Sequence, residues 1–88
     1  MSWTVRLAKA AARQLSRLPS DHQELLRKHL REMIVDPFHG DVKPLKGKQW
    51  KGRYRKRVGR YRVIFIPFYV EQIVEASAIL LRSEKTYR

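Results

Sequence analysis

Two different spacings of hydrophobic residues divide the first half of the chain. Residues 2–7 carry an apolar side chain at every second position, which is typical of a short strand. Over residues 8–18 the spacing changes to three or four, which predicts an amphipathic helix that ends at Pro19. A second helix is predicted from Ser20, which with Gln23 matches a capping box, to Asp36-Pro37. Its buried stripe is expected to comprise Leu25, Leu26, Leu30, Met33 and Ile34.

The second half of the chain returns to strand-like alternation after a turn-rich stretch at 39–48. Residues 54–58 and 61–66 are predicted strands, joined by a two-residue turn at Gly59-Arg60. Residues 73–81 are almost wholly apolar, which predicts a central strand buried on both faces. The link at 67–71 lacks the usual turn residues and is expected to expose aromatic side chains.

These elements predict one α+β domain over residues 1–88. Two helices joined by a very short connection must pack as an antiparallel hairpin. The expected order is an N-terminal strand, this hairpin, and then a three-strand antiparallel meander. The two helices should cover one face of the resulting four-stranded sheet.

The positive charge is concentrated in one segment of the chain. The protein has a net charge of +12, and residues 1–44 carry eight Lys and Arg against five Asp and Glu. Residues 45–88 carry twelve against three, and nine cations with no acid lie between positions 46 and 62. Because apolar residues alternate with these cations, the charge is expected on a folded sheet, where it favours a polyanionic partner.

Alternation along the basic strand aligns Arg53, Arg55 and Arg57 on one face, about 6.6 Å apart. This spacing suits successive phosphates of an extended single strand, and arginine binds phosphate through two parallel hydrogen bonds. Any one of these side chains is more simply a solvated charge that protects an outer strand from pairing. The aligned set is better explained by an anionic partner. The predicted RNA-binding residues are Lys51, Arg53, Lys56, Arg57 and Arg60.

Other classes of protein find little support in the sequence. There is no cysteine, so disulfides, thiolate catalysis and Cys-type zinc sites are excluded. His22 and His29 could share a helix face, but without a third ligand they do not predict a metal site. No cofactor is expected, and no apolar run approaches the length of a membrane span. The N-terminus lacks the apolar region of a signal peptide, which predicts a cytoplasmic protein.

The basic segment and the chain's end resemble a known toxin superfamily. Residues 50–65, with a basic strand, a Gly turn and then Tyr61-Arg62 before an apolar strand, resemble the central signature of RelE/ParE toxins. Leu45-Lys46-Gly47 is similar to the motif that precedes it, and residues 82–87 are similar to the closing Arg…Tyr motif. The expected order of elements is also that of the superfamily.

If the chain follows the RelE branch, the resemblance implies ribosome-dependent cleavage of mRNA, in which a 2′-hydroxyl attacks the adjacent phosphate. Such chemistry needs a base, an acid and cations that hold the charged transition state. The resemblance implies a phosphate contact for Arg62, leaving-group stabilisation for Arg82, and base stacking or proton transfer for Tyr87. Arg55 completes the expected catalytic set, at a place where the best-known RelE toxins have a lysine.

Two alternatives remain open at this point. Arginine stays protonated and is a poor base, so a lysine would have to deprotonate the 2′-hydroxyl. Lys51 and Lys56 lie nearby, but alternation turns Lys56 away from Arg55. The absence of an evident base favours a ParE-like toxin that poisons DNA gyrase without nuclease activity. A non-catalytic module that binds RNA or an acidic protein would also explain the charge.

The resemblance also implies partners. A toxin of this superfamily is expected to bind an acidic antitoxin, with Phe68-Tyr69-Val70 and the outer helical face as candidate docking sites. A RelE-like toxin would bind the ribosome and mRNA. Operator DNA would be bound only by the toxin–antitoxin complex, and no membrane partner is expected.

Overall fold

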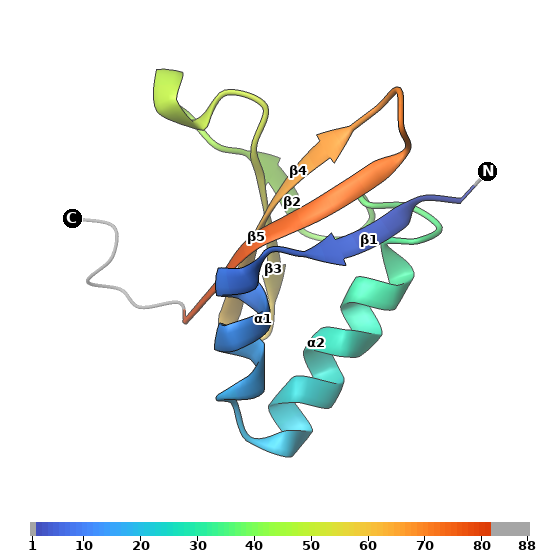
Figure 1. The fold of residues 1–88 in the computed structure, drawn as a ribbon. Coiled ribbons are helices and arrows are strands. Elements are labelled where there is room, and N and C mark those ends of the chain that lie inside the picture. Colours follow the sequence, from blue (N-terminus) through green and yellow to red (C-terminus); the bar gives the residue numbers. More distant parts are fainter. Residues whose placement is uncertain (1, 82–88) are drawn as a thin grey trace.

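The described part of the chain contains five strands and two α-helices (Figure 1). The computed structural model describes residues 2–81. The elements in chain order are β1 (Thr4–Leu7), α1 (Lys9–Ser16), α2 (Ser20–Glu32), β2 (Val42–Pro44), the 3₁₀ turn η1 (Lys48–Trp50), β3 (Tyr54–Val58), β4 (Tyr61–Phe68) and β5 (Ile73–Leu81). Neither α-helix in this part of the chain is long and apolar enough to cross a membrane.

The strands form one sheet in the order β1-β5-β4-β3-β2. The meander β3-β4-β5 is antiparallel, as predicted, with a bulge beside Ile64 and Phe65. β1 lies parallel to β5 at one edge, and β2 pairs with β3 at the other. The predicted count of four strands was therefore wrong. β2 was not predicted because it has only three residues, which is too short for an alternating pattern. It ends in a proline, which a strand tolerates at the edge of a sheet.

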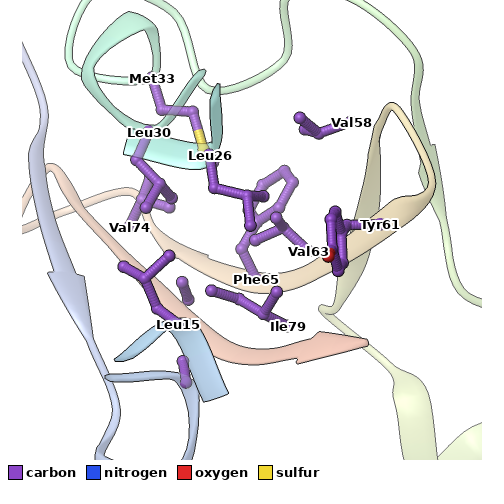
Figure 2. Packing of buried hydrophobic residues seen from close by; sticks show 12 residues of the cluster. Leu15, Leu26, Leu30, Met33, Val58, Tyr61, Val63, Phe65, Val74 and Ile79 are labelled. Carbon is purple, nitrogen blue, oxygen red and sulfur yellow. The ribbon is translucent and has the colours of Figure 1, made fainter. Parts of the chain in front are cut away.

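Both helices pack on the same face of the sheet and close a single core (Figures 1 and 2). Ala11 and Leu15 of α1 and Leu26 of α2 meet the central strands there. The sheet contributes a larger group of buried side chains to this cluster: Val58, Tyr61, Val63, Phe65, Val74, Ala76 and Ile79. The α+β class and the one-sided helical layer are confirmed, and no helix of residues 2–81 lies over the second face of the sheet, which is called the uncovered face below.

Three local predictions need correction. α2 begins at Ser20 with Pro19 at its N-cap, and no side chain caps it. The Gln23 side chain instead donates to the carbonyl oxygen of Leu18, 2.8 Å away, so it closes the interhelical turn rather than a capping box. Leu25 and Ile34 are exposed, so the buried stripe of α2 is narrower than predicted. β5 is fully buried only on its helix face, at Val74, Ala76 and Ile79, whereas Ile73 and Glu75 on the other face are partly exposed.

The turns between the meander strands are of two kinds. Val58 pairs with Tyr61 around Gly59, whose φ of 56° lies in the left-handed region that favours glycine. The β4–β5 turn has Gln72 at a φ of 57° and leaves Tyr69 and Val70 exposed, as the sequence indicated. The two turns lie at opposite ends of β4.

Candidate nucleic-acid interface

β3 separates its side chains between the two faces of the sheet. Tyr54 and Val58 pack against the core under the helices. Because neighbouring residues of a strand point to opposite faces, Arg55 and Arg57 lie on the face without helices. Arg53, just before β3, continues this alternation. The predicted alignment of arginines along the basic strand is therefore present on an uncovered surface.

The sheet register brings further cations to the same surface. Arg62 on β4 lies directly opposite Arg57, and Lys43 on β2 lies directly opposite Arg55. Residues directly opposite each other share a face, with Cβ atoms about 5 Å apart. Three adjacent strands thus present one cationic face, comprising Lys43, Arg53, Arg55, Arg57 and Arg62. Lys43 was not predicted, because it joins this face only through the pairing of β2 with β3.

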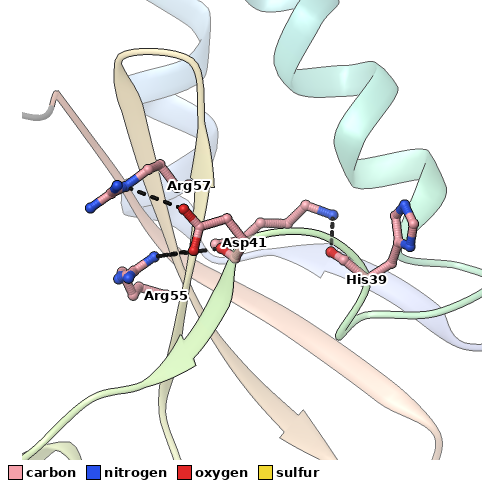
Figure 3. A network of polar contacts seen from close by, with 5 residues as sticks. His39, Asp41, Arg55 and Arg57 are labelled. Carbon is pink, nitrogen blue, oxygen red and sulfur yellow. Dashed lines mark hydrogen bonds and ion pairs between the residues drawn. The ribbon is translucent and has the colours of Figure 1, made fainter.

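One carboxylate lies within this cationic face (Figure 3). The Oδ1 atom of Asp41 accepts a hydrogen bond from Nη1 of Arg55 at 3.1 Å, and Oδ2 lies 3.6 Å from Nε of Arg57. The hydrogen bond from Arg55 lowers the pKa of Asp41 below its ordinary value of 3.8, and the charges of Arg55 and Arg57 add to this effect. Asp41 is therefore a counter-ion at neutral pH and a poor proton acceptor. It was missed because its contacts depend on the sheet register.

The rest of the uncovered face is mostly apolar. Ile64, opposite Arg55, is buried there although it lies outside the core cluster. Toward β1, Nε of Arg6 lies 2.7 Å from Oε1 of Glu75, and its guanidinium stands 5.7 Å from the Phe68 ring centroid. Arg6 is thus already neutralised. The excess positive charge of this face belongs to the end formed by β2, β3 and β4.

Lys56 requires a correction to the predicted RNA-binding set. Its side chain points to the helix side of β3, only 2% of the residue is exposed, and Nζ donates to the backbone oxygen of His39 at 3.1 Å. Burial lowers the pKa of Lys56 below its ordinary value of 10.5. A lysine in this position does not reach RNA bound on the other face. Its orientation away from Arg55 is as alternation predicted.

The remaining predicted residues lie around the cationic face or beyond the described chain. Lys51 is exposed in the turn after η1, and Arg60 is exposed in the β3–β4 turn. Arg82 and Tyr87 lie outside the described residues. Trp50 is 39% exposed, and the Arg53 guanidinium lies 5.7 Å from its ring centroid.

Within residues 2–81, the charged side chains gathered on this face are mainly cations. Asp41 and Glu75, the two carboxylates on the uncovered side within residues 2–81, are both ion-paired. His22 lies on the helix side, where its Nδ1 is 2.7 Å from the Tyr61 hydroxyl oxygen. No three His, Asp or Glu side chains of residues 2–81 are grouped so that they could hold a metal ion. The net charge of the side chains gathered on this face is therefore positive.

The sequence matches one known protein family. A protein-family model for the ParE toxin of the type II toxin–antitoxin system parDE matches residues 5–86. No curated protein matches the sequence significantly.

Several solved structures share the fold. In the archaeal RelE–RelB complex from Pyrococcus horikoshii, one chain is 24% identical with a TM-score of 0.82, over 96% of this chain and 99% of that one. In the toxin–antitoxin complex RelBE2 from Mycobacterium tuberculosis, one chain is 23% identical with a TM-score of 0.83, over 93% and 100%. The isolated Escherichia coli RelE toxin is 21% identical with a TM-score of 0.76, over 98% and 93%.

Proposed function

The chain belongs to the ParE toxin family of type II toxin–antitoxin systems, and we propose that this toxin inhibits translation by cleaving mRNA on the ribosome. The observation that supports this activity is the cationic face. Arg57 and Arg62 are directly opposite on neighbouring strands, and Arg55 is two residues from Arg57 on the same side. Like charges so placed repel one another, so an anionic ligand is the simplest reason to gather them.

The reaction proposed is an internal transfer that needs no metal. The 2′-oxygen forms a bond to the adjacent phosphorus while the bond from phosphorus to the 5′-oxygen breaks, which leaves a cyclic phosphate and a free 5′-hydroxyl. Negative charge grows on the phosphate oxygens as this happens. Arg57 and Arg62 stabilise that charge with guanidinium donors held by the sheet, the contribution that usually dominates such catalysis.

Proton transfer is assigned to groups beside these arginines. Lys56 faces the helices, so the lysine that shares the cationic face is Lys43, opposite Arg55. The proposed acceptor of the 2′-hydroxyl proton is Lys43 or Lys51 in its neutral amine form, because the ammonium form has no lone pair to accept a proton. By resemblance to RelE toxins, Arg82 is proposed to stabilise the negative charge that develops on the leaving 5′-oxygen. Tyr87 is proposed to stack on a base or to take part in proton transfer.

A second candidate is poisoning of DNA gyrase without RNA cleavage. One observation favours it. The carboxylates of Asp41 and Glu75 on the uncovered face are ion-paired, and His22 lies on the opposite, helix side of the sheet. A toxin that only binds does not require a proton acceptor. The two candidates differ in target, so one set of assays separates them.

The proposed partners follow from the same charge distribution. Structures with this fold include complexes of RelE with RelB antitoxins. For this chain we propose an acidic antitoxin that neutralises the net charge of +12 and covers the exposed Phe68, Tyr69 and Val70. Ribosome and mRNA are the proposed targets of the free toxin. Operator DNA is the proposed ligand of the toxin–antitoxin complex.

The decisive experiment compares three proteins in a purified translation system. The wild type should inhibit translation and produce mRNA fragments that end in a cyclic phosphate. Arg57→Ala with Arg62→Ala should abolish both effects, whereas Arg13→Ala with Arg17→Ala, the same charge change at exposed positions of the helical layer, should abolish neither. Equal inhibition by all three contradicts the proposal. Inhibition of gyrase supercoiling without mRNA fragments would establish the second candidate.

A further inference from the structure

Asp41 touches two of the arginines to which the proposed function assigns RNA binding, and it does so with both its side chain and its backbone. Its carboxylate lies between Arg55 and Arg57 (Figure 3). Its carbonyl oxygen accepts the backbone N–H of Arg57 at 2.9 Å and lies 3.5 Å from Nη1 of Arg55. One residue therefore fixes the strand register and the directions of two guanidinium groups.

We propose that Asp41 is a positioning residue that orients Arg55 and Arg57 for a phosphate of the bound RNA. This inference rests on the proposed function, because it assigns a role within the same site. Asp41 acts through the two arginines and makes no contact with the reacting atoms. Its negative charge weakens attraction to RNA, yet the order that it imposes raises the rate of the reaction.

Burial explains why Arg55 needs this partner. Arg55 is only 9% exposed, and a buried guanidinium without an anion or acceptor is strongly unfavourable. The carboxylate satisfies the charge through Nη1, which carries two of the five N–H donors of the guanidinium group. The remaining donors can serve a phosphate from an orientation that is already fixed, so less side-chain entropy is lost when RNA binds.

The segment that carries Asp41 is held from both sides of β3. On the helix side, Nζ of Lys56 donates to the backbone oxygen of His39, two residues before Asp41. On the uncovered side, Arg55 and Arg57 hold Asp41 itself. Lys56 thus has a structural role that fits its buried position, since it helps to fix the loop from which Asp41 reaches the arginines.

This arrangement predicts opposite effects on binding and on turnover. Asp41→Asn removes one negative charge from the cationic face, so a single-stranded RNA oligonucleotide should bind several-fold more tightly at low salt. The amide cannot pair with two guanidinium groups as a carboxylate does, so their directions are no longer fixed. Misplacement of a catalytic group costs rate steeply, and mRNA cleavage should fall about 10-fold or more.

The test uses four full-length proteins: wild type, Asp41→Asn, Asp41→Glu, and Asp21→Asn as a control with the same charge change on α2. Each is assayed for oligonucleotide affinity, for mRNA cleavage in a purified translation system, and for the NMR signals of the Arg55 and Arg57 Nε–H groups. Thermal unfolding verifies that each variant is folded. Asp41→Asn should bind more tightly, cleave more slowly and show shifted or broadened Nε–H signals.

Asp41→Glu should recover cleavage in part without tighter binding, and Asp21→Asn should match the wild type. Cleavage by Asp41→Asn at the wild-type rate would overturn the inference, as would weaker binding together with slower cleavage, which indicates a purely structural role. If the wild type itself does not cleave mRNA, the proposed function fails. The affinity and Nε–H signals then decide separately whether Asp41 orients the arginines, and unchanged signals would refute that role.

Discussion

The two faces of the sheet use the same strands for different purposes. On the helix side, Val58, Val63 and Phe65 form part of a closed apolar core. On the other side, the same strands present Arg57 and Arg62 without a helical cover. Alternation along a strand separates stability from ligand binding, so changes on the first face should alter the fold and changes on the second should alter activity.

Arg55 and Lys56 are adjacent buried cations on opposite faces of the sheet, and their hydrogen-bond partners differ. Lys56 has a backbone carbonyl as its hydrogen-bond partner, whereas Arg55 has a carboxylate that it shares with Arg57. Lys56 is buried on the helix side, where its hydrogen bond fixes the backbone at His39. The arginine remains part of a charged surface where further donors can meet a ligand.

The largest effect is expected from damage to the helix side. Phe65 is fully buried at the centre of the core, and Phe65→Ala should lower the free energy of unfolding by about 3–5 kcal/mol through lost burial and a cavity. For a chain of 88 residues this is a large part of the total stability. Urea unfolding followed by circular dichroism measures it. A loss below about 1 kcal/mol would mean that this face is not the main source of stability.

A smaller and pH-dependent effect is expected at Lys56. Burial lowers its pKa below 10.5, so between the lowered value and 10.5 the unfolded chain binds more protons than the folded chain. The contribution of this residue to stability must therefore increase as the pH rises through that window. Lys56→Met should lack this increase and, near pH 7, should change the free energy of unfolding by no more than about 1 kcal/mol. Parallel stability curves between pH 7 and 10.5 would contradict the interpretation.

The smallest effect on stability is expected from the uncovered face. Arg57→Ala with Arg62→Ala relieves the repulsion between two opposite cations but also removes the ion pair from Arg57 to Asp41, so the free energy of unfolding should change by no more than about 1 kcal/mol in either direction. The same variant is the one expected to lose translation inhibition. Thermal unfolding provides the measurement. Marked destabilisation would show that the arginines support the fold and would remove the contrast between the faces.

Local patterns predicted the helices, the meander and the side of β3 on which the arginines lie. They could do so because the helical and strand spacings differ, and because Gly59 marks the turn of the hairpin. Pairing between distant strands has no such local signal. The parallel position of β1 beside β5 and the short edge strand β2 both depend on contacts made only in the folded chain.

The part of the site that lies along one strand was predicted, and the part that depends on pairing between strands was not. Arg53, Arg55 and Arg57 were recognised because they alternate within one strand. Lys43 and Asp41 join them through the β2–β3 register, which the sequence does not reveal. Lys56 was included as an RNA contact on charge alone, although alternation already directed it to the core. Arg82 and Tyr87 remain predictions that lie outside the described residues.

We propose that a polyanion binds the uncovered sheet face at β2, β3 and β4. The most direct measurement is an NMR titration of the wild-type protein with a single-stranded RNA oligonucleotide, followed at backbone amides and arginine Nε–H groups. The largest shifts should cluster at Lys43, Arg55, Arg57 and Arg62, while α1 and α2 should change little. Shifts confined to the helices, or spread evenly over both faces, would contradict it.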